Sequence, residues 1–387
     1  MNNRIRFNSP IFKILLVFLT WRFVLVVISS FAIYFVPLGY KDRFLGGGSI
    51  NYGISPQLFA WANFDGEHYL SIAIFGYKFL EQAFFPIYPL LISFFSKPGS
   101  MDLIKSLVNS TVVGLLISNI SFVLALIYLW ELIKEDFPQK IAYLTIVLIL
   151  IFPTSFYFGA VYNESLFLLL SVLSFYSARK GHWPLAGVFG MVASATRVFG
   201  IFLLPALLIE AWSQRISFPK ILWILLIPLG LGAYMLYLNF TVGDPVAFYS
   251  FQTLVGEQHQ RGIVTLPQVY FRYIKMLATT SLDNPIFQVV VLEFFVGLTF
   301  FILPIYGYFK KIRLSYLVFA MLGFLIPTIQ GSFSSLPRYV IVFFPSFLAA
   351  SLWVNGLPKL FKAMILILSF LILIVETSLF LRGYWVA

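Results

Sequence analysis

Asp65 and Glu67 stand one residue apart within residues 63–89 (NFDGEHYLSIAIFGYKFLEQAFFPIYP), in a chain that otherwise contains little charge. The 387 residues are 60% hydrophobic and 11% charged, so two neighbouring acids need an explanation. A carboxylate at a membrane interface can act as a general base that takes a proton from an attacking hydroxyl group. The alternative for Asp65 is an N-cap, because it precedes GEHYLSIAIF and could cap an interfacial helix.

The backbone conformation decides which side chains accompany Asp65. In a helix Asp65 would share a face with His68, and Glu67 would point elsewhere. In an extended segment the two carboxylates would share a side. The phrase FFPIYP at residues 84–89, which includes Tyr88, has two closely spaced prolines and cannot lie deep in a regular helix. It predicts a short interfacial helix or simply a kinked helix start.

Two arginines are candidate phosphate ligands. Arg197, in ASATRVFG, lies inside the apolar region 183–212, where a charge is costly unless it is paired or faces water. It would either pair with a buried carboxylate such as Glu164 or Glu210, or bind the phosphate of a lipid substrate. Arg338, in SSLPRY at the outer end of a predicted span, is the second candidate. Its alternative is an interfacial arginine whose side chain snorkels toward the headgroups.

The phrase YNES at residues 162–165 precedes an apolar run. Glu164 is expected in the first turn of that span, where the helix dipole favours an acid. Asn163 is either the N-cap or, with Glu164, part of a polar wall of an outward-facing cavity. Further along, GDPVAF (243–248) predicts a turn and a helix start, and the polar residues between 252 and 261 could bind an acceptor.

No motif supports metal or nucleotide chemistry. The three histidines are scattered, the chain has no cysteine, and it has no HExxH, P-loop or strand-linked GxGxxG pattern. We therefore predict no metal and no cofactor. The net charge of +11 comes mostly from basic residues in short segments between apolar runs, which is the topogenic pattern of membrane proteins and not a nucleic-acid patch.

The elements that must position these residues are membrane helices. The mean hydropathy is +0.92 and apolar runs of spanning length recur, which predicts a polytopic all-α membrane protein with about 11 crossings in one integral domain, residues 1–387. The region 183–212 is too short for two full crossings and predicts two short or broken helices that meet near Thr196 and Arg197. The other spans are predicted at about 11–37, 108–131, 141–158, 164–178, 220–239, 286–307, 314–330, 338–354 and 361–380.

The basic residues orient the chain. The first apolar run is too long for a signal-peptide core and is interpreted as an uncleaved span. With the N-terminus inside, the short cytoplasmic segments collect most of the Lys and Arg residues outside the long loops. The two long loops, about 38–107 and about 241–285, then face outside, and Asp65 with them. We predict a multi-pass protein of a prokaryotic plasma membrane with its active site on the external face.

In series, these phrases resemble the PIG-V family, the GPI mannosyltransferase II group and its bacterial relatives. The matching pieces run from about residue 63 to 342, in the order NFDGEHYLSIAIFGY, FFPIYP, FPTSFYFGAVYNESLF, ATRVFG, GDPVAF and SLPRYV. The chain departs from the family at Phe64, where relatives usually have Trp, and at residues 72–77, where IAIFGY replaces IAEHGY. The GPI precursor that eukaryotic members use as acceptor is therefore not assumed.

The resemblance implies a GT-C glycosyltransferase, in particular a mannosyltransferase, that uses a polyprenyl-phosphate sugar and a lipid or glycan acceptor, with inversion. Such enzymes have an essential carboxylate in the first external loop, and Asp65 is at the matching position, where it would be the base. Arg197 or Arg338 would hold the donor phosphate, which makes a metal unnecessary. The residues expected to bind substrate are Glu67, His68, Tyr88, Asn163, Glu164, Arg197 and Arg338.

A transporter or flippase for a lipid-linked or anionic substrate is the competing interpretation. Broken helices and an intramembrane arginine suit that class as well. Against it, the chain has no visible two-fold repeat, and its polar residues concentrate on the predicted external side. A non-catalytic assembly subunit is the third alternative, but it would not need both Asp65 and the two arginines.

Overall fold

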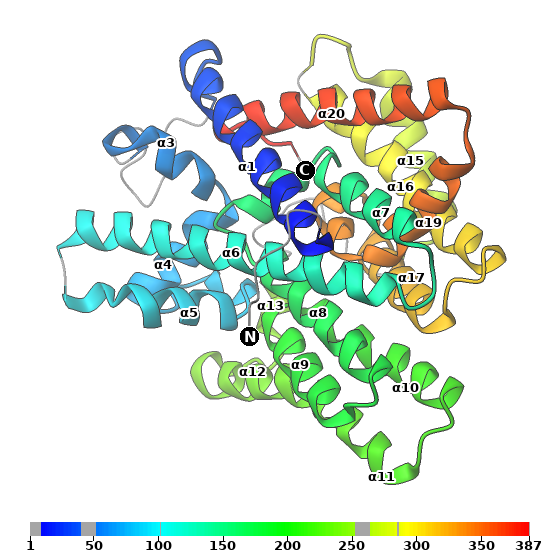
Figure 1. Cartoon of the computed structure of the whole chain (residues 1–387). Coiled ribbons are helices and arrows are strands. Elements are labelled where there is room, and N and C mark those ends of the chain that lie inside the picture. Colours follow the sequence, from blue (N-terminus) through cyan, green and yellow to red (C-terminus); the bar gives the residue numbers. More distant parts are fainter. Residues whose placement is uncertain (1–8, 40–51, 101, 252–263, 285, 387) are drawn as a thin grey trace.

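The computed structural model describes residues 9–39, 52–100, 102–251, 264–284 and 286–386 (Figure 1). Within these ranges every regular element is an α-helix or a short 3-10 helix, as predicted. Long apolar runs form helices readily in this setting, because a helix satisfies all its backbone hydrogen bonds within one segment. The all-α prediction is therefore confirmed for the described part of the chain.

Five helical segments in the described ranges are long and apolar enough to cross a membrane. The shortest has 23 residues, and at a rise of 1.5 Å per residue this is about 34 Å, which exceeds the hydrocarbon core of a bilayer. The five are α1 (Pro10–Phe35), α6 (Leu103–Ile133), the run of α11 (Phe218–Ile221), η7 (Leu222–Leu226) and α12 (Ile227–Val242), α16 (Ile286–Phe309) and α20 (Lys359–Leu381).

A sixth crossing exists if one bent pair is counted as a single span. This pair consists of α18 (Leu336–Tyr339) with η8 (Val340–Val342), followed by α19 (Phe344–Gly356), and it bends by 87°. The remaining predicted crossings correspond to helices of 11 to 16 residues, which reach at most about 24 Å. The predicted total of about 11 crossings is therefore not confirmed. These shorter helices are α7 (Gln139–Leu150), α8 (Glu164–Arg179), α9 (Trp183–Thr196), α10 (Leu203–Ser213) and α17 (Leu314–Thr328), whereas α5 (Ile87–Ser96) lies in the first predicted external loop.

The first predicted external loop is largely helical where it is described. Helix α5 starts at Ile87 directly after Pro86, so the helix start predicted within FFPIYP is confirmed. In the second loop, the predicted polar surface between residues 252 and 261 lies outside the described residues. The helices of the two loops are α3 (Pro56–Phe59), η2 (Ala60–Ala62), α4 (Asp65–Phe75), η3 (Glu81–Ala83), α13 (Ala247–Ser250) and α15 (Leu266–Thr279).

The region 183–212 forms the two short helices that its length predicts. Helix α9 ends at Thr196, Arg197 has an extended backbone, and η6 (Val198–Phe202) then leads into α10. Gly200 permits this sharp return, because a Cβ atom there would lie 2.3 Å from the amide nitrogen of Ser194. The break thus places Arg197 between two helices and not on the side of one.

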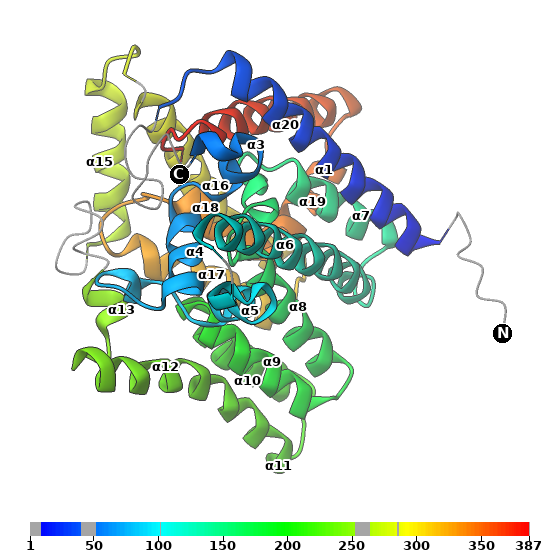
Figure 2. The ribbon, with the colours of Figure 1, turned by 90° about the vertical axis from the view of Figure 1, so that its left-hand side faces the viewer.

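Helices α6 and α8 form the middle of the molecule (Figures 1 and 2). Helix α8 packs against both α6 and α9, and α9 packs against α12. On the other side α10 packs on α17, and α7 and α16 pack on α19. Figure 1 shows α9 to α12 in green at one end and α15 to α20 in yellow to red at another, while α4 and α5 lie beside α6. Helix α8 also contacts η5 (Ser155–Gly159) and η8, so segments from both halves of the chain meet at α8.

Candidate active site

Four charged side chains from distant segments meet in a row of alternating charge. Arg338 Nη1 lies 2.6 Å from Asp65 Oδ2, and Arg338 Nε lies 3.8 Å from Glu164 Oε1. Arg197 Nη1 lies 2.5 Å from the same oxygen of Glu164. The row runs Asp65, Arg338, Glu164, Arg197, and its formal charges cancel. This cancellation makes burial tolerable, because an uncompensated charge in a low-dielectric interior is strongly unfavourable.

Asp65 is presented at the start of α4 by a strained turn. Phe64, directly before it, has a positive φ of 58°, which is rare for a bulky residue. The turn is fixed by Asn63, whose side-chain amide donates to the carbonyl of Phe380 at 2.8 Å and whose own carbonyl accepts from the Tyr162 hydroxyl at 2.8 Å. Asp65 is the first residue of the helix and not its N-cap, and the cap position has no side-chain hydrogen bond. The capping interpretation is therefore wrong, and the carboxylate faces Arg338.

Close packing brings this turn against the segment that precedes α8. Val161 donates its amide to the carbonyl of Trp61 at 2.9 Å. A Cβ atom on Gly66 would lie 3.3 Å from the carbonyl oxygen of Val161, so glycine permits the tight approach. Arg22, which interrupts the apolar sequence of α1, donates to the carbonyl of Gly159 at 3.0 Å and stacks on Trp61. Arg22 was not predicted as a site residue, although a charge within a span was the available signal.

Asn163 and Glu164 lie at the start of α8 and contribute the buried side of the site. Asn163 occupies the N-cap position, but its side chain makes no capping bond. Its Oδ1 atom instead accepts from Arg197 Nη1 at 3.0 Å, and its Nδ2 atom donates to the carbonyl of Thr196 at 2.9 Å. Glu164 lies in the first turn, as predicted, and only 1% of it is exposed. Its Oε2 atom is buried and has no hydrogen-bond partner among the described residues.

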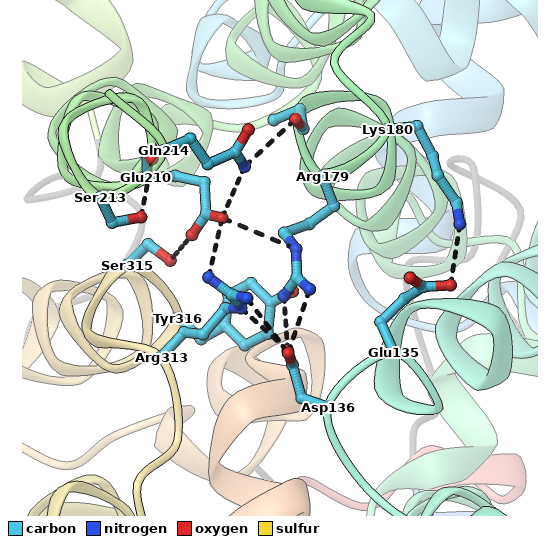
Figure 3. Close-up of polar contacts among 11 residues, drawn as sticks. Glu135, Asp136, Arg179, Lys180, Glu210, Ser213, Gln214, Arg313, Ser315 and Tyr316 are labelled. Carbon is cyan, nitrogen blue, oxygen red and sulfur yellow. Dashed lines mark hydrogen bonds and ion pairs between the residues drawn. The ribbon is translucent and has the colours of Figure 1, made fainter. Parts of the chain in front are cut away.

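Arg197 is buried, and one of its two predicted partners is confirmed. It pairs with Glu164, and its guanidinium also lies against the rings of Phe199 and Tyr339, at 5.4 and 5.8 Å from their centroids. The other predicted partner, Glu210, is wrong: it lies in a separate cluster with Arg179 and Arg313 at the opposite end of α8 (Figure 3).

Arg338 is enclosed by aromatic rings. It is 8% exposed and lies on the single turn of α18. This turn begins directly after Ser335, which has a φ of 59°. Its guanidinium carbon lies 5.8 Å from the ring centroids of both Tyr157 and Tyr162, and 5.1 Å from that of Tyr339. A snorkelling arginine would reach solvent, so that interpretation is wrong. The three tyrosines were not predicted from the sequence, because single aromatic residues are common in such a chain.

Asp65 is the member of the row that solvent reaches. Its side chain is 25% exposed, compared with 9% for the side chain of Arg338. Arg338 Nε is buried and has no hydrogen-bond partner among the described residues. The site therefore combines an accessible carboxylate with a cation whose hydrogen-bonding capacity is not used up.

His68 lies one turn after Asp65 and forms a pair with Glu81. Its Nδ1 atom lies 3.9 Å from Glu81 Oε1, and its ring stacks on that of Phe84. Burial lowers the pKa of His68, but the interaction with Glu81 and the neighbouring carboxylates outweigh this and raise it above its usual value. Burial raises the pKa of Glu81, but the interactions with His68 and Ser71 and the hydrogen bond from the amide of Lys78 leave it below its usual value.

The other two predicted substrate ligands are buried. Glu67 is 9% exposed and lies two positions after Asp65 on α4. Tyr88 is fully buried, and its hydroxyl donates to the carbonyl of Gly114 at 3.0 Å. In this conformation Tyr88 supports the packing of α5 on α6, and it is not part of the accessible surface. Among the described residues, no three His, Asp or Glu side chains are grouped as metal ligands.

A family described as "Mannosyltransferase (PIG-V)" matches residues 6–216, which is more than half of the chain. The chain belongs to the PIG-V mannosyltransferase family. The matched range includes Asp65, Glu164 and Arg197, whereas Arg338 lies beyond it. A comparison with curated proteins gave no match. The protein is therefore a member of a glycosyltransferase family.

A solved structure shows the fold of this family member. The apo structure of ArnT from Cupriavidus metallidurans is similar with a TM-score of 0.51 and 13% identity, over 92% of this chain and 62% of that chain. The oligosaccharyltransferase of Archaeoglobus fulgidus gives a TM-score of 0.45 and 14% identity, over 95% of this chain and 55% of that chain. The chain thus spans less than two thirds of the length of these proteins. The likeness to ArnT shows a GT-C fold.

Proposed function

We propose that this PIG-V family member transfers a sugar, in particular mannose, from a polyprenyl-phosphate donor to an acceptor hydroxyl group. The observation that carries the proposal is the direct pairing of an accessible carboxylate, Asp65, with a buried guanidinium, Arg338, at 2.6 Å. Transfer from a glycosyl phosphate needs a base for the acceptor and a cation for the departing phosphate. Both groups are present side by side.

The chemistry is a single displacement. Asp65 takes the proton of the acceptor hydroxyl as its oxygen attacks the anomeric carbon of the sugar. The bond between that carbon and the phosphate oxygen breaks, and its electron pair leaves with the polyprenyl phosphate. Arg338 neutralises the charge that develops on the phosphate. Attack opposite the leaving group inverts the anomeric centre.

Between the two candidate arginines, the contacts favour Arg338 as the phosphate ligand. Arg197 is held by both Glu164 and Asn163, whereas Arg338 has an unused Nε donor. A guanidinium has five N–H donors, so Arg338 can bind a phosphate oxygen while it keeps Asp65 in place. Arg197 then acts through Glu164, by setting the orientation of the carboxylate that Arg338 approaches.

An external location of the site agrees with the positions of the other charges. Glu164 begins α8 and Arg179 ends it, so about 22 Å separates the site from the second charge cluster. That cluster contains Arg179 and Arg313, which the distribution of basic residues assigns to the cytoplasmic side. We therefore propose that the site faces the outside of a prokaryotic plasma membrane.

Replacement of the base tests the proposal. Purified protein is incubated with polyprenyl-phosphate mannose and, separately, polyprenyl-phosphate glucose, with a membrane lipid extract as the source of acceptors. Asp65→Asn should slow sugar transfer by about 10²- to 10⁴-fold, because it removes the base and keeps the size of the side chain. Glu135→Gln is the control and should retain activity within about threefold, since Glu135 pairs with Lys180 at the other end of α8 and leaves the Asp65 to Arg338 pair intact. Full activity of Asp65→Asn would exclude Asp65 as the base.

A further inference from the structure

A buried carboxylate that is not part of the row of charges binds the loop at residues 329–335, which connects α17 to α18 and so presents Arg338. Glu293, on α16, is 4% exposed, and both of its oxygens bind neutral donors. Its Oε1 atom accepts from the amide of Ser335 at 3.1 Å, and its Oε2 atom accepts from the hydroxyl of Tyr273 at 2.6 Å. The Tyr273 hydroxyl in turn accepts from the amide of Phe333 at 3.1 Å. Two side chains therefore bind two amides of the same loop.

The amide that Glu293 binds belongs to a strained residue. Ser335 has a φ of 59°, in the left-handed region that is unfavourable for residues with a side chain. Its carbonyl accepts from the amides of Arg338 and Tyr339, both at 3.1 Å, and so begins the single turn of α18. The backbone conformation of Ser335 therefore sets the position of Arg338, which pairs with Asp65.

The hydrogen bond to Ser335 explains why a carboxylate is present at position 293. A carboxylate within a membrane helix is costly, and a leucine would pack there without a desolvation penalty. Its hydrogen bonds to Ser335 and Tyr273 compensate part of that cost. The gain is a fixed backbone at the start of α18, which apolar packing alone does not specify.

Helix α15 and the residue Val264 that precedes it form two further hydrogen bonds to the same loop. Arg272 Nη1 donates to the carbonyl of Gly331 at 3.0 Å, and the amide of Val264, just before the helix, donates to the carbonyl of Ile329 at 2.9 Å. Tyr270 also lies on α15, but its hydroxyl donates to the carbonyl of Gly297 on α16 at 2.9 Å and not to the loop. Tyr270 therefore provides a matched control for Tyr273.

We propose that Glu293 and Tyr273 are positioning residues that fix the left-handed turn at Ser335 and thereby hold the Arg338 guanidinium for the donor phosphate. The proposal rests on the function proposed above. Glu293 binds the backbone amide of Ser335, and Tyr273 binds both Glu293 and the backbone amide of Phe333. Neither residue contacts the reacting atoms. The expected consequence of their loss is a misplaced cation, and a displacement of about 1 Å can cost about 10²-fold in rate.

The test compares four variants of the full chain: Glu293→Leu, Glu293→Gln, Tyr273→Phe and Tyr270→Phe. Apparent donor KM and kcat are measured with polyprenyl-phosphate mannose, together with the melting temperature. Glu293→Leu and Tyr273→Phe should lower kcat/KM by about 10- to 100-fold. Glu293→Gln should restore activity to within about threefold of the parent, because its carbonyl can still accept from the Ser335 amide. Tyr270→Phe should not change kcat/KM beyond about twofold.

A second measurement does not depend on sugar transfer. Because the chain has no cysteine, Ser334→Cys introduces a unique thiol into the loop. Glu293→Leu should raise the maleimide labelling rate of this thiol severalfold, and Tyr270→Phe should leave it unchanged. If the parent protein transfers no sugar but the labelling rates differ as stated, the proposed function fails and the positioning of the turn stands. Equal labelling rates, or a loss of melting temperature in Glu293→Leu and Tyr273→Phe without any change in kcat/KM, would overturn the positioning role.

Discussion

At the scale of single residues, the site is built by pairing charges that could not be buried alone. Glu164 is the central member, because one of its oxygens lies near both arginines, at 2.5 Å from Arg197 and 3.8 Å from Arg338. Asp65 ends the row on its accessible side. The contacts hold the Asp65 carboxylate and the Arg338 guanidinium in place within the folded protein, so the cost of organising the site is met during folding.

Removal of one buried charge should destabilise the protein more than removal of both. Arg197→Met leaves Glu164 with one poorly placed cation, and we expect a loss of about 3 to 5 kcal/mol in the free energy of unfolding. The double variant Arg197→Met, Glu164→Gln should recover more than half of that loss. Thermal unfolding in detergent micelles measures both. A double variant less stable than Arg197→Met alone would show that the pair is not the origin of the effect.

The pair formed by His68 and Glu81 predicts a pH dependence beside the site. The pKa of His68 is raised in the folded protein, so the stabilisation is present below its unfolded value of 6.5 and is lost as the pH rises through the higher folded value. The pKa of Glu81 is lowered, so its contribution is lost only in acid, as the pH falls below 4.5. Between about pH 6 and 8 the melting temperature should decline in the parent protein, and more weakly in His68→Gln. Parallel curves for the two proteins would exclude His68 as the titrating group.

At the scale of helices, the sequence predicted where the helices lie along the chain better than it predicted which side chains pair between them. The apolar runs predicted α1, α6, α16 and α20 closely, because helix formation in a membrane depends on local composition. The break at Arg197 also followed from length alone. The Asp65 to Arg338 pair joins residues 273 positions apart, which no local pattern encodes. A helix N-cap and a long-range ion pair use the same residue type, so the sequence could not separate them.

The break between α9 and α10 depends on one close approach. A Cβ atom on Gly200 would lie 2.3 Å from the Ser194 amide nitrogen, so Gly200→Ala must push η6 away from α9. We expect this to cost at least about 1 to 3 kcal/mol of stability and to move Arg197 out of the row. Gly232→Ala on α12 is the control, because no atom outside the local helix lies within 4 Å of its Cβ position. It should be neutral or stabilising, by up to about 1 kcal/mol in melting experiments. Equal stability of the two variants would show that η6 adjusts without strain.

At the scale of the whole molecule, both halves of the chain are needed for the site. The family match ends at residue 216, yet Arg338 and the loop that presents it come from the C-terminal half. A second cluster lies at the other end of α8, where Asp136 binds both Arg179 and Arg313 (Figure 3). Burial raises the pKa of Asp136, but hydrogen bonds from the two arginines leave it below its usual value. The molecule is thus held by ion pairs at both ends of its central helix.

These two ends give a direct test of orientation. Lys78 lies just after α4 and donates its amide to Glu81, the partner of His68, whereas Lys140 lies at the start of α7, close in sequence to Asp136. Both side chains are exposed, and the chain has no cysteine, so Lys78→Cys and Lys140→Cys each introduce a single accessible thiol. In intact cells a membrane-impermeant maleimide should label Lys78→Cys directly and Lys140→Cys only after permeabilisation, because the positive-inside rule predicts a cytoplasmic location for the second cluster. The opposite labelling pattern would place Asp65 on the cytoplasmic side and would require a donor that is consumed there.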